Sequence, residues 1–331
     1  MQGAILSAIR EPLVIRTLPD PVAAPGQAVV RLHAAALNHR DLWIQQGLYK
    51  NIQLPLVPGS DGAGRVVAVG SPADSGWVGR EVIINPSLDW GDDPRAQGKQ
   101  FRILGMPDSG TFAEQIAIAV GNLAPKPAHL SWEQAAALPL AGLTAWRALF
   151  TRAQLKPGER VLVTGVGGGA ALFALQFAVA AGARAWVTSG SPDKIARATK
   201  LGALGGANYR DPAWAESLQP AGPFDLIVDS AGGDGFAQLV DLTAPGGRIV
   251  FFGATTGNPS KGLDLRKSFF RQINVLGTTM GSPADFAGMT ALVADKKITP
   301  IVDRVFALSD ADAALRHMEA GGQFGKIVLA G

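Results

Sequence analysis

The stretch VLVTGVGGGAA, residues 161–171, decides the fold of this chain. Residues 161–164 are apolar or β-branched, which is typical of a buried parallel strand. After a glycine-rich turn, residues 171–181 are apolar except for Gln176, as in a buried helix. Glycines let a pyrophosphate approach the backbone, and the helix N-terminus offers it free N–H groups. In this strand–turn–helix context the motif predicts a dinucleotide site rather than a glycine turn without a ligand.

Further runs downstream of this motif fit a Rossmann-type domain. We expect strands over 185–188, 224–229, 248–252 and 274–279, and an amphipathic helix over 193–201. Strands that alternate with helices predict right-handed crossovers and a doubly wound parallel sheet. The predicted fold class is therefore α/β.

Composition sets limits on the function of the chain. Its 331 residues are enough for two domains, with 47% apolar and 17% charged residues. The 30 basic residues form no run and are nearly balanced by 27 acidic ones, which argues against nucleic-acid binding. No apolar run reaches the roughly 18 residues that span a bilayer, and no signal segment opens the chain. We therefore expect a cytoplasmic protein without a membrane partner.

Metal ligands are scarce in this sequence. The chain contains no cysteine, and its four histidines form no closely spaced pair. Disulfides and thiolate metal sites are therefore excluded, and a catalytic zinc is not expected.

The first 125 residues differ from the rest in their sequence pattern. Short β-like runs separated by Pro/Gly turns predict a twisted, barrel-like β domain. The segment 281–331 alternates helix and strand and is expected to return to this domain, leaving 126–280 as the dinucleotide-binding domain. The runs expected as strands in the first domain are 13–16, 27–34, 63–69 and 81–85.

Motifs along the whole chain resemble the medium-chain dehydrogenases/reductases, and within them the zinc-free quinone oxidoreductase (zeta-crystallin-like) branch. This resemblance implies a GroES-like β-rich catalytic domain beside the Rossmann domain. The motifs are ALNHRD (36–41), GLY (47–49), PGSDGAG (58–64), GTFAE (110–114), LPLAGLTA (138–145), NYR (208–210) and GKIV (325–328).

Departures from the zinc-using members of that superfamily are equally informative. Those members carry a cysteine where this chain has Asn38, and a His-Glu pair near Ser60 and Asp61. They also carry a four-cysteine lobe where this chain has residues 89–102. Because all these ligands are lost, the resemblance also implies a metal-free protein, although residues 38–49 still resemble zinc-type alcohol dehydrogenase-like proteins.

The end of the second strand bears on the choice of cofactor. NAD-specific sites place a carboxylate there for the ribose 2′-hydroxyl. This chain instead has Ser189 and Ser191, with Lys194 one turn later, and hydroxyls with a cation suit a 2′-phosphate. The resemblance places Tyr209 and Arg210 beside the adenosine phosphate. The sequence therefore favours NADPH over NADH, with a solvated Lys194 and a surface salt bridge of Arg210 as the alternatives.

Other cofactor contacts are expected from the glycine turn, the strand ends and the C-terminal motif. The turn approaches the pyrophosphate, and the resemblance implies that the ends of the third and fourth strands line the nicotinamide. The resemblance also places Thr144 near the nicotinamide and Lys326 near a cofactor phosphate. The alternative for Thr144 is a hydrogen bond to its own helical turn. The full set is Thr144, Gly167, Gly168, Gly169, Ala170, Ser230, Gly232, Phe252, Gly253 and Lys326.

The candidate catalytic residues are the polar ones in the matched first-domain segment. Without a metal, reduction of an enone or quinone must rely on hydrogen-bond donors and a shaped pocket. Asn38 is expected to hold the nicotinamide ribose or a substrate oxygen, and Tyr49 to donate a hydrogen bond or the proton. Asp41 either takes part or braces the local backbone. A quinone requires no donor, because its reduced oxygens can take protons from water.

The leading functional hypothesis is an NADPH-dependent, metal-free oxidoreductase that transfers hydride to a quinone or an α,β-unsaturated carbonyl. The alternatives are an alcohol or aldehyde dehydrogenase-like oxidoreductase and a non-catalytic NADPH-binding protein. Relatives associate by joining edge strands of the cofactor domain, so we expect a homodimer through residues 274–279. A small-molecule carbonyl or quinone is the other expected partner.

Overall fold

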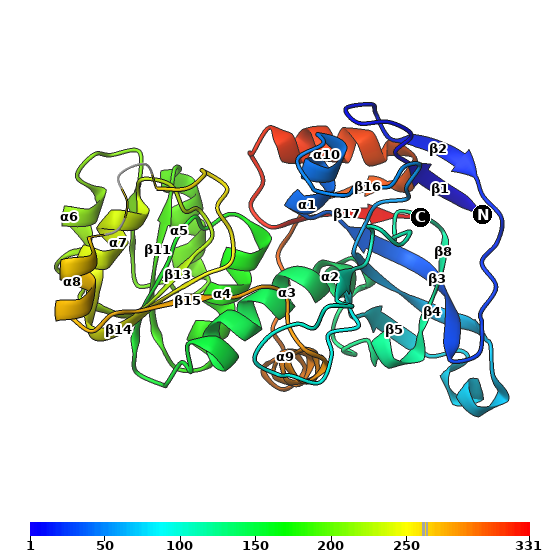
Figure 1. Ribbon diagram of the computed structural model, residues 1–331, viewed down its shortest axis with the longest axis horizontal. Helices are drawn as coiled ribbons and strands as arrows, with labels where there is room; N and C mark the ends of the chain where they lie inside the picture. The colour runs from blue at the N-terminus through cyan, green and yellow to red at the C-terminus, as the bar shows by residue number, and fades with distance from the viewer. Residues whose placement is uncertain (260–261, 263) are drawn as a thin grey trace. The chain divides into compact units, whose positions relative to one another are not determined.

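The computed structural model describes residues 1–259, 262 and 264–331. The chain forms two compact units, Met1–Ala141 with Gly281–Gly331, and Gly142–Met280. Both chain ends belong to the first unit (Figure 1). That unit extends beyond residue 125, where the sequence analysis placed its end, because helix α2 (Trp132–Ala137) packs on strands of the first unit.

The described part of the second unit is built on a six-stranded parallel sheet. Its strand order, β12-β11-β10-β13-β14-β15, is that of a doubly wound dinucleotide-binding sheet, with the order reversing between β10 and β13. The α/β prediction is confirmed, and β12 is the strand that sequence analysis missed. Its bounds and those of its neighbours are β10 Arg160–Val163, β11 Arg184–Ser189, β12 Gly206–Asn208, β13 Phe224–Asp229, β14 Thr243–Phe251 and β15 Asn274–Gly277.

Helices connect the strands of this sheet. The helix after the glycine turn, α4, is buried along most of its length, which explains why its sequence is apolar on every side. By contrast α5 is amphipathic, with one buried residue, Ala198. The helices of the unit are a π-helical turn Arg147–Arg152, α4 Gly169–Ala180, α5 Pro192–Lys200, α6 Trp214–Leu218, α7 Phe236–Leu242 and α8 Leu265–Phe270.

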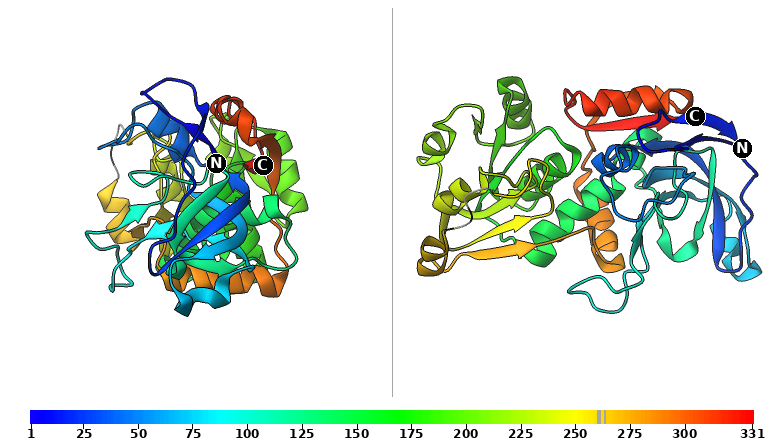
Figure 2. Two further views of the ribbon diagram at one scale, coloured as in Figure 1. Left: turned by 90° about the vertical axis from the view of Figure 1, so that its right-hand side faces the viewer. Right: turned by 45° about the horizontal axis from the view of Figure 1, so that its top comes forward.

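The first unit is a mostly antiparallel β structure. Strands pair in the order β16-β17-β3-β4-β5-β9, with β8 also on β3, and two small hairpins, β1-β2 and β6-β7, stand apart. The C-terminal strands β16 and β17 therefore complete a sheet begun near the N-terminus (Figure 2). The bounds are β1 Gln2–Ile5, β2 Val14–Thr17, β3 Gln27–Ala36, β4 Asp61–Val69, β5 Glu81–Ile84, β6 Ser87–Leu88, β7 Arg102–Ile103, β8 Gln115–Ala119, β9 Leu123–Pro125, β16 Val302–Ala307 and β17 Lys326–Ala330.

The first unit also contains helices. Helix α2 begins with a capping box in which Ser131 and Gln134 bond each other's backbone N–H groups. Helix α3 begins in the first unit and ends in the second. The helices are α1 His39–Gln45, α2, α3 Pro139–Trp146, α9 Pro283–Lys296 and α10 Ala311–Glu319, with 3-10 turns at Pro72–Trp77, Val120–Asn122 and Leu308–Asp310.

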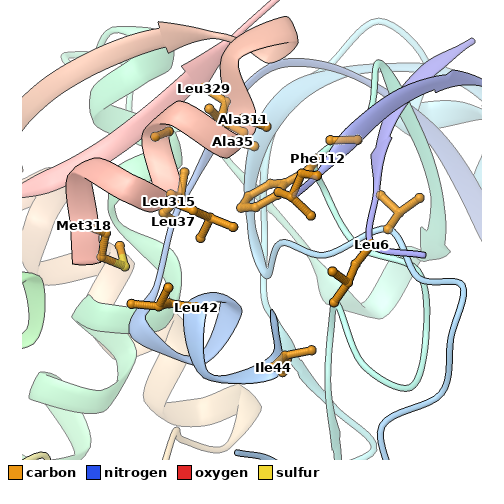
Figure 3. Packing of buried hydrophobic residues seen from close by; sticks show 14 of the residues in the cluster. Leu6, Ala35, Leu37, Leu42, Ile44, Phe112, Ala311, Leu315, Met318 and Leu329 are labelled. Atoms are coloured by element: carbon orange, nitrogen blue, oxygen red, sulfur yellow. The ribbon is translucent and has the colours of Figure 1, made fainter. Parts of the chain in front are cut away.

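A hydrophobic cluster holds α1 and α10 against the sheet of the first unit (Figure 3). Leu42 of α1 and Leu315 of α10 belong to it, together with Leu329 of β17 and Phe112, which precedes β8. Burying a side chain of this size contributes about 1.5–3 kcal/mol, so the cluster fixes α1 in place. This matters because Asn38 and Asp41 lie at the N-terminus of α1.

No helix in the described part of the chain is both long and apolar enough to cross a bilayer.

Candidate functional site

The glycine turn of the second unit links β10 to α4. Gly165 and Gly167 have φ of +66° and +132°, which side chains rarely adopt, so glycine is required at both positions. The turn is braced by β11, because Gly165 N and Val166 N donate to Thr188 Oγ1 and Thr188 O at 3.1 and 2.7 Å. Helix α4 begins at Gly169 without a side-chain cap. Its first N–H groups are therefore available to an anion.

The predicted adenosine-side residues gather around two glycines. A Cβ built on Gly190 would lie 2.8 Å from Tyr209 Oη and 3.0 Å from Arg210 Nε. A Cβ built on Gly167 would lie 2.9 Å from Lys194 Cδ and 3.4 Å from Lys194 Nζ. Tyr209 and Arg210, which follow β12, thus lie beside the residue after β11, and Lys194 of α5 lies beside the glycine turn. A phosphate near Gly190 would meet a phenol and a guanidinium, and a phosphate near Gly167 would meet an ammonium.

Ser189 differs from its predicted role. Its side chain is buried, and Oγ donates to Val166 O at 3.1 Å and accepts from Ser191 N at 3.4 Å. The hydroxyl proton is therefore used within the protein, and Ser189 braces the glycine turn instead of offering that proton to a phosphate. Ser191 is half-buried at the N-cap of α5.

The carboxyl ends of β13 and β14 carry the predicted nicotinamide-side residues. Ser230 and Gly232 follow β13, and Phe252 and Gly253 follow β14. The two loops are joined by hydrogen bonds, including Thr256 N to Ala231 O at 2.9 Å and Gly233 N to Gly257 O at 2.7 Å. These hydrogen bonds make the two strand ends one connected edge.

Asp229 anchors this edge and was missed by sequence analysis. Its buried carboxylate accepts from Thr164 Oγ1 at 2.5 Å and from Gly232 N at 2.8 Å. These bonds tie the end of β10 to the loop after β13, across the point where the strand order reverses. A carboxylate as the last residue of a predicted strand is a signal that could have found it. Thr144 is buried in α3.

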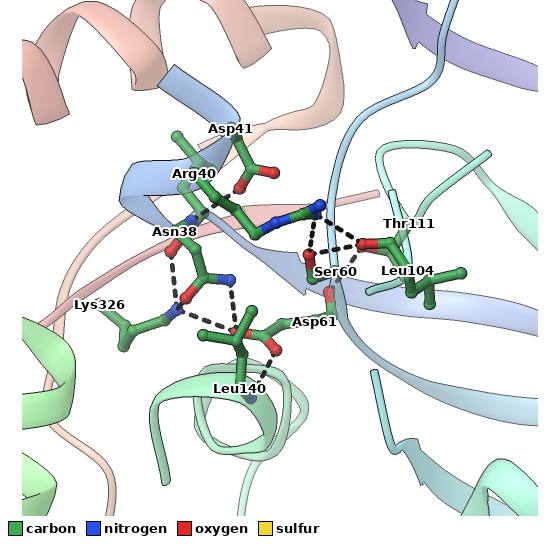
Figure 4. Close-up of polar contacts among 10 residues, drawn as sticks. Asn38, Arg40, Asp41, Ser60, Asp61, Leu104, Thr111, Leu140 and Lys326 are labelled. Atoms are coloured by element: carbon green, nitrogen blue, oxygen red, sulfur yellow. Dashed lines mark hydrogen bonds and ion pairs between the residues drawn. The ribbon is translucent and has the colours of Figure 1, made fainter. Parts of the chain in front are cut away.

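In the first unit, Asn38 stands at the centre of a buried polar network (Figure 4). Lys326 Nζ donates to Asn38 Oδ1 at 2.6 Å, to Asp61 Oδ2 at 2.9 Å and to Leu37 O at 2.7 Å. Asn38 Nδ2 donates to Asp61 Oδ2 at 2.9 Å, and Leu140 N donates to Asp61 Oδ1 at 2.7 Å. All three donors of the Lys326 ammonium are used, so the expected contact of Lys326 with a cofactor phosphate is not what this structure shows.

Arg40 forms a second buried branch of the network. Its NH1 group donates to Ser60 Oγ and to Leu104 O, both at 2.8 Å, and Ser60 Oγ donates to Leu104 O at 2.7 Å. Arg40 also lies over the ring of Tyr49, with Cζ 5.7 Å from the ring centroid. Neither Arg40 nor the pairing of Asp61 with Lys326 was predicted, since the latter joins residues 265 apart in sequence.

Asp41 braces the backbone, as one of its two predicted roles required. Asn38 N donates to Asp41 Oδ2 at 2.8 Å, which caps α1. The other oxygen, Oδ1, has no hydrogen-bond partner among the described residues. Burial raises the pKa of this carboxyl to about 6, against the opposing effects of the Arg40 charge and the Asn38 hydrogen bond. Tyr49 is half-buried and its ring stacks near Trp43 at 6.5 Å.

Comparison with known proteins finds dehydrogenases and reductases. Residues 24–128 match an alcohol dehydrogenase GroES-like domain, and residues 165–295 match a family described as zinc-binding dehydrogenase. A zinc-type alcohol dehydrogenase-like protein of Leptosphaeria maculans is 34% identical over 96% of this chain and 94% of its own length. An acryloyl-coenzyme A reductase of Metallosphaera sedula is 28% identical over 99% of both chains.

Among solved structures, the crystal structure of an NAD-dependent alcohol dehydrogenase is 37% identical to this chain. The superposition of the two covers 100% of each chain, with a TM-score of 0.93. The predicted pairing of a GroES-like β-rich unit with a Rossmann unit is therefore confirmed.

Proposed function

Because this chain belongs to the medium-chain dehydrogenase/reductase superfamily and is an oxidoreductase of it, we propose that it is an NADPH-dependent, metal-free reductase of a quinone or an α,β-unsaturated carbonyl. The observation that carries the proposal is the position of Lys326 Nζ between Asn38 and Asp61. A reductase of an activated double bond can work with hydrogen-bond donors alone. The acryloyl-coenzyme A reductase of Metallosphaera sedula supports this class, since its name describes reduction of a double bond beside a carbonyl.

A zinc ion does not fit the donor set of this chain. Zinc is bound in proteins by cysteine, histidine and carboxylate ligands, and the chain has no cysteine. Asn38 and Asp61 lie where the zinc-using members carry ligands. Their oxygens already accept hydrogen bonds from the Lys326 ammonium group. In residues 1–259, 262 and 264–331 no group of three or more histidine, aspartate or glutamate side chains could hold a metal. No step of the proposed reaction therefore passes through a metal.

A dinucleotide does fit the second unit. A Cβ built on Gly168 would meet nothing within 4 Å, so the backbone of the turn is open to a ligand. The turn and the start of α4 would hold the pyrophosphate, and Lys194, Tyr209 and Arg210 would hold the adenosine end. When bound, NADPH supplies a hydride. The loops after β13 and β14 would orient the nicotinamide, since hydrogen bonds join them into one edge.

The polar side chains of the first unit supply hydrogen bonds in the proposed reaction. Asn38 donates a hydrogen bond to an oxygen of the cofactor or substrate. Tyr49 is the candidate proton donor for an enone, whereas a reduced quinone takes its protons from water. An alcohol dehydrogenase-like activity is the second candidate, because two of the similar proteins bear that name.

The function is tested with purified protein, NADPH and a panel of quinones, enones, alcohols and aldehydes. We expect NADPH oxidation with quinones or enones that is unaffected by a chelator, and no stoichiometric zinc by elemental analysis. Activity confined to alcohols and dependent on added zinc would contradict the proposal. Tight NADPH binding with no turnover on any substrate would favour a non-catalytic role.

We expect cofactor choice to depend on Lys194 beside Gly167, together with Tyr209 and Arg210 beside Gly190. A charge-assisted bond to a 2′-phosphate contributes about 1.5–3 kcal/mol, which corresponds to roughly tenfold to a hundredfold in affinity. Lys194→Ala should therefore raise the KM for NADPH by that factor and leave the KM for NADH nearly unchanged. The measurement is kcat/KM for both cofactors in each variant.

Two results would count against that placement of the 2′-phosphate. One is a wild-type preference for NADH, the cofactor class in the name of the NAD-dependent structural relative. The other is an equal loss for both cofactors in Lys194→Ala, which would move the lysine to the pyrophosphate beside Gly167. Lys200→Ala, at the far end of α5, is the matched control and should change neither constant.

Homodimer formation is proposed through the β15 edge of the second unit. Among the described residues β15 pairs with β14 alone. Large apolar side chains are exposed on β15 and α8: Leu265, Phe269, Phe270 and Val275. Phe270 is 84% exposed, so Phe270→Glu should convert a dimer into a monomer without loss of stability. Val22→Glu is the control, because Val22 is equally exposed, at 86%, in the first unit. Light scattering at micromolar concentration gives the mass; a monomeric wild type would refute the proposal.

A further inference from the structure

The Lys326 ammonium and the Asp61 carboxylate determine the orientation of the Asn38 side-chain amide between them. An ammonium group only donates, so the Asn38 atom at 2.6 Å from Lys326 Nζ must be the carbonyl oxygen. An ionised carboxylate only accepts, so the Asn38 atom at 2.9 Å from Asp61 Oδ2 must be the amide nitrogen. The reversed amide would bring N–H to N–H and oxygen to oxygen (Figure 4). One orientation is therefore strongly preferred.

Both charged partners are themselves held from several sides. Lys326 Nζ also bonds Leu37 O, next to Asn38 in the chain, and Lys326 opens strand β17. Asp61 opens β4, and its second oxygen receives Leu140 N from the first turn of α3. A carboxylate at that place is stabilised by the helix N-terminus. Because Leu37 O, Leu140 N and the Asn38 amide all bond to the pair, neither side chain can turn without breaking hydrogen bonds.

The network leaves one donor of Asn38 unused. Nδ2 carries two hydrogens, and within the described residues one of them has a partner, Asp61 Oδ2. The ammonium at Oδ1 draws electron density from the amide and makes the remaining N–H a stronger donor. The chemistry that fits this N–H is an oxygen acceptor, such as a ribose hydroxyl of the cofactor or a carbonyl of the substrate.

We infer that Lys326 and Asp61 are positioning residues that lock the Asn38 carboxamide with its free N–H directed to an oxygen of the bound cofactor or substrate. This inference rests on the proposed function for the identity of the ligand, but the locked amide itself does not. A well-packed apolar pair at the same positions can match a buried ion pair in stability. Only the charged pair dictates the orientation of the amide between them, and that is the role assigned here.

The test uses a neutral double variant, Lys326→Met/Asp61→Asn, in the full chain. The amide introduced at position 61 would keep an oxygen for Leu140 N and turn its NH2 group toward residue 38, so the Asn38 amide is expected to flip. Glu159→Gln is the matched control, because it breaks the partly buried Glu159–Arg248 pair in the other unit. The side-chain amide signal of Asn38, identified by its loss in Asn38→Ala, is followed by 15N NMR without any substrate.

In wild type we expect two separate Asn38 amide hydrogen signals, of which the one bonded to Asp61 exchanges slowly with water. In the double variant both should shift, whereas Glu159→Gln should leave them in place. Wild-type signals in a folded double variant would overturn the locked-amide inference, whatever the enzyme's activity. If NADPH oxidation is absent from wild type while the signals behave as expected, the proposed function fails and the locked amide stands.

Kinetics then separate a positioning role from a merely structural one. In the double variant kcat/KM should fall at least tenfold, while Glu159→Gln stays within twofold of wild type. In an Asn38→Ala background the double variant should have no further effect, because its action passes through Asn38. A rise in the Kd for NADPH identifies the cofactor as the acceptor, and an unchanged Kd with a lower kcat identifies the substrate. A full additive loss in the Asn38→Ala background would overturn the positioning role.

Discussion

Lys326→Met alone is expected to lower the free energy of unfolding by about 3–5 kcal/mol, the usual cost of leaving one member of a buried ion pair without its partner. Asp61 and Lys326 are 0% and 4% exposed, so water cannot replace the lost ammonium. The loss would be a large fraction of the roughly 5–15 kcal/mol that stabilises a typical domain. Urea denaturation followed by tryptophan fluorescence measures it.

Adding Asp61→Asn to Lys326→Met should recover most of that loss. The neutral pair carries no uncompensated charge, and the introduced amide still offers an oxygen to Leu140 N. Lys50→Met controls for the removal of an exposed lysine and should change stability by less than about 0.5 kcal/mol. Equal losses in the single and double variants would show that the charge pairing contributes nothing and that packing alone is disturbed.

The free energy of unfolding of Asp41→Asn is expected to rise, relative to that of wild type, by about 2 kcal/mol between pH 4 and pH 7, because part of the whole change lies below pH 4. The pKa of Asp41 is about 6 in the folded protein and 3.8 as an ordinary carboxyl, and each unit corresponds to about 1.4 kcal/mol. Between these values the folded protein holds a proton that the unfolded chain has released. Stability therefore falls as the pH rises from about 4 to about 6, and the full penalty remains above that range.

The measurement is the free energy of unfolding of wild type and Asp41→Asn at pH 4, 5, 6 and 7. The carboxamide oxygen of the variant can still accept from Asn38 N, so the cap of α1 survives while the titration disappears. Leu42→Ala is the control on the same helix. It removes packing and no titrating group, so its loss should be the same at every pH. A difference between Asp41→Asn and wild type that does not vary with pH would mean that Asp41 titrates normally.

Much of the second unit could be predicted from local sequence. The strand 224–229 and the helix after the glycine turn were predicted because apolar periodicity and glycine placement report on burial and turning within a few residues. Strand β12 was missed because its three residues, Gly206–Asn208, carry no pattern of their own. Its pairing with β11 makes it a strand.

For the candidate site, too, the sequence predicted some features and not others. Sequence drew attention to Asn38 and Asp41 through their motif and to Lys194 through its place after a predicted strand. The family resemblance drew attention to Tyr209 and Arg210. The hydrogen-bond partners of these residues were not predicted. Ser189 was expected to face a phosphate and instead braces the turn through Val166 O. A hydroxyl can satisfy either role, and only the neighbouring backbone decides between them.

The sequence alone determined the two-unit organisation in outline, the glycine turn between β10 and α4, and the absence of thiolate ligands. These features depend on residue type, spacing and composition. Only the tertiary structure decided that Lys326 contacts Asn38 and pairs with Asp61, which precedes it by 265 residues. The physical reason is that a buried charge must find its partner in space. That partner is set by how strands β17 and β4 both flank β3, and no local pattern records this.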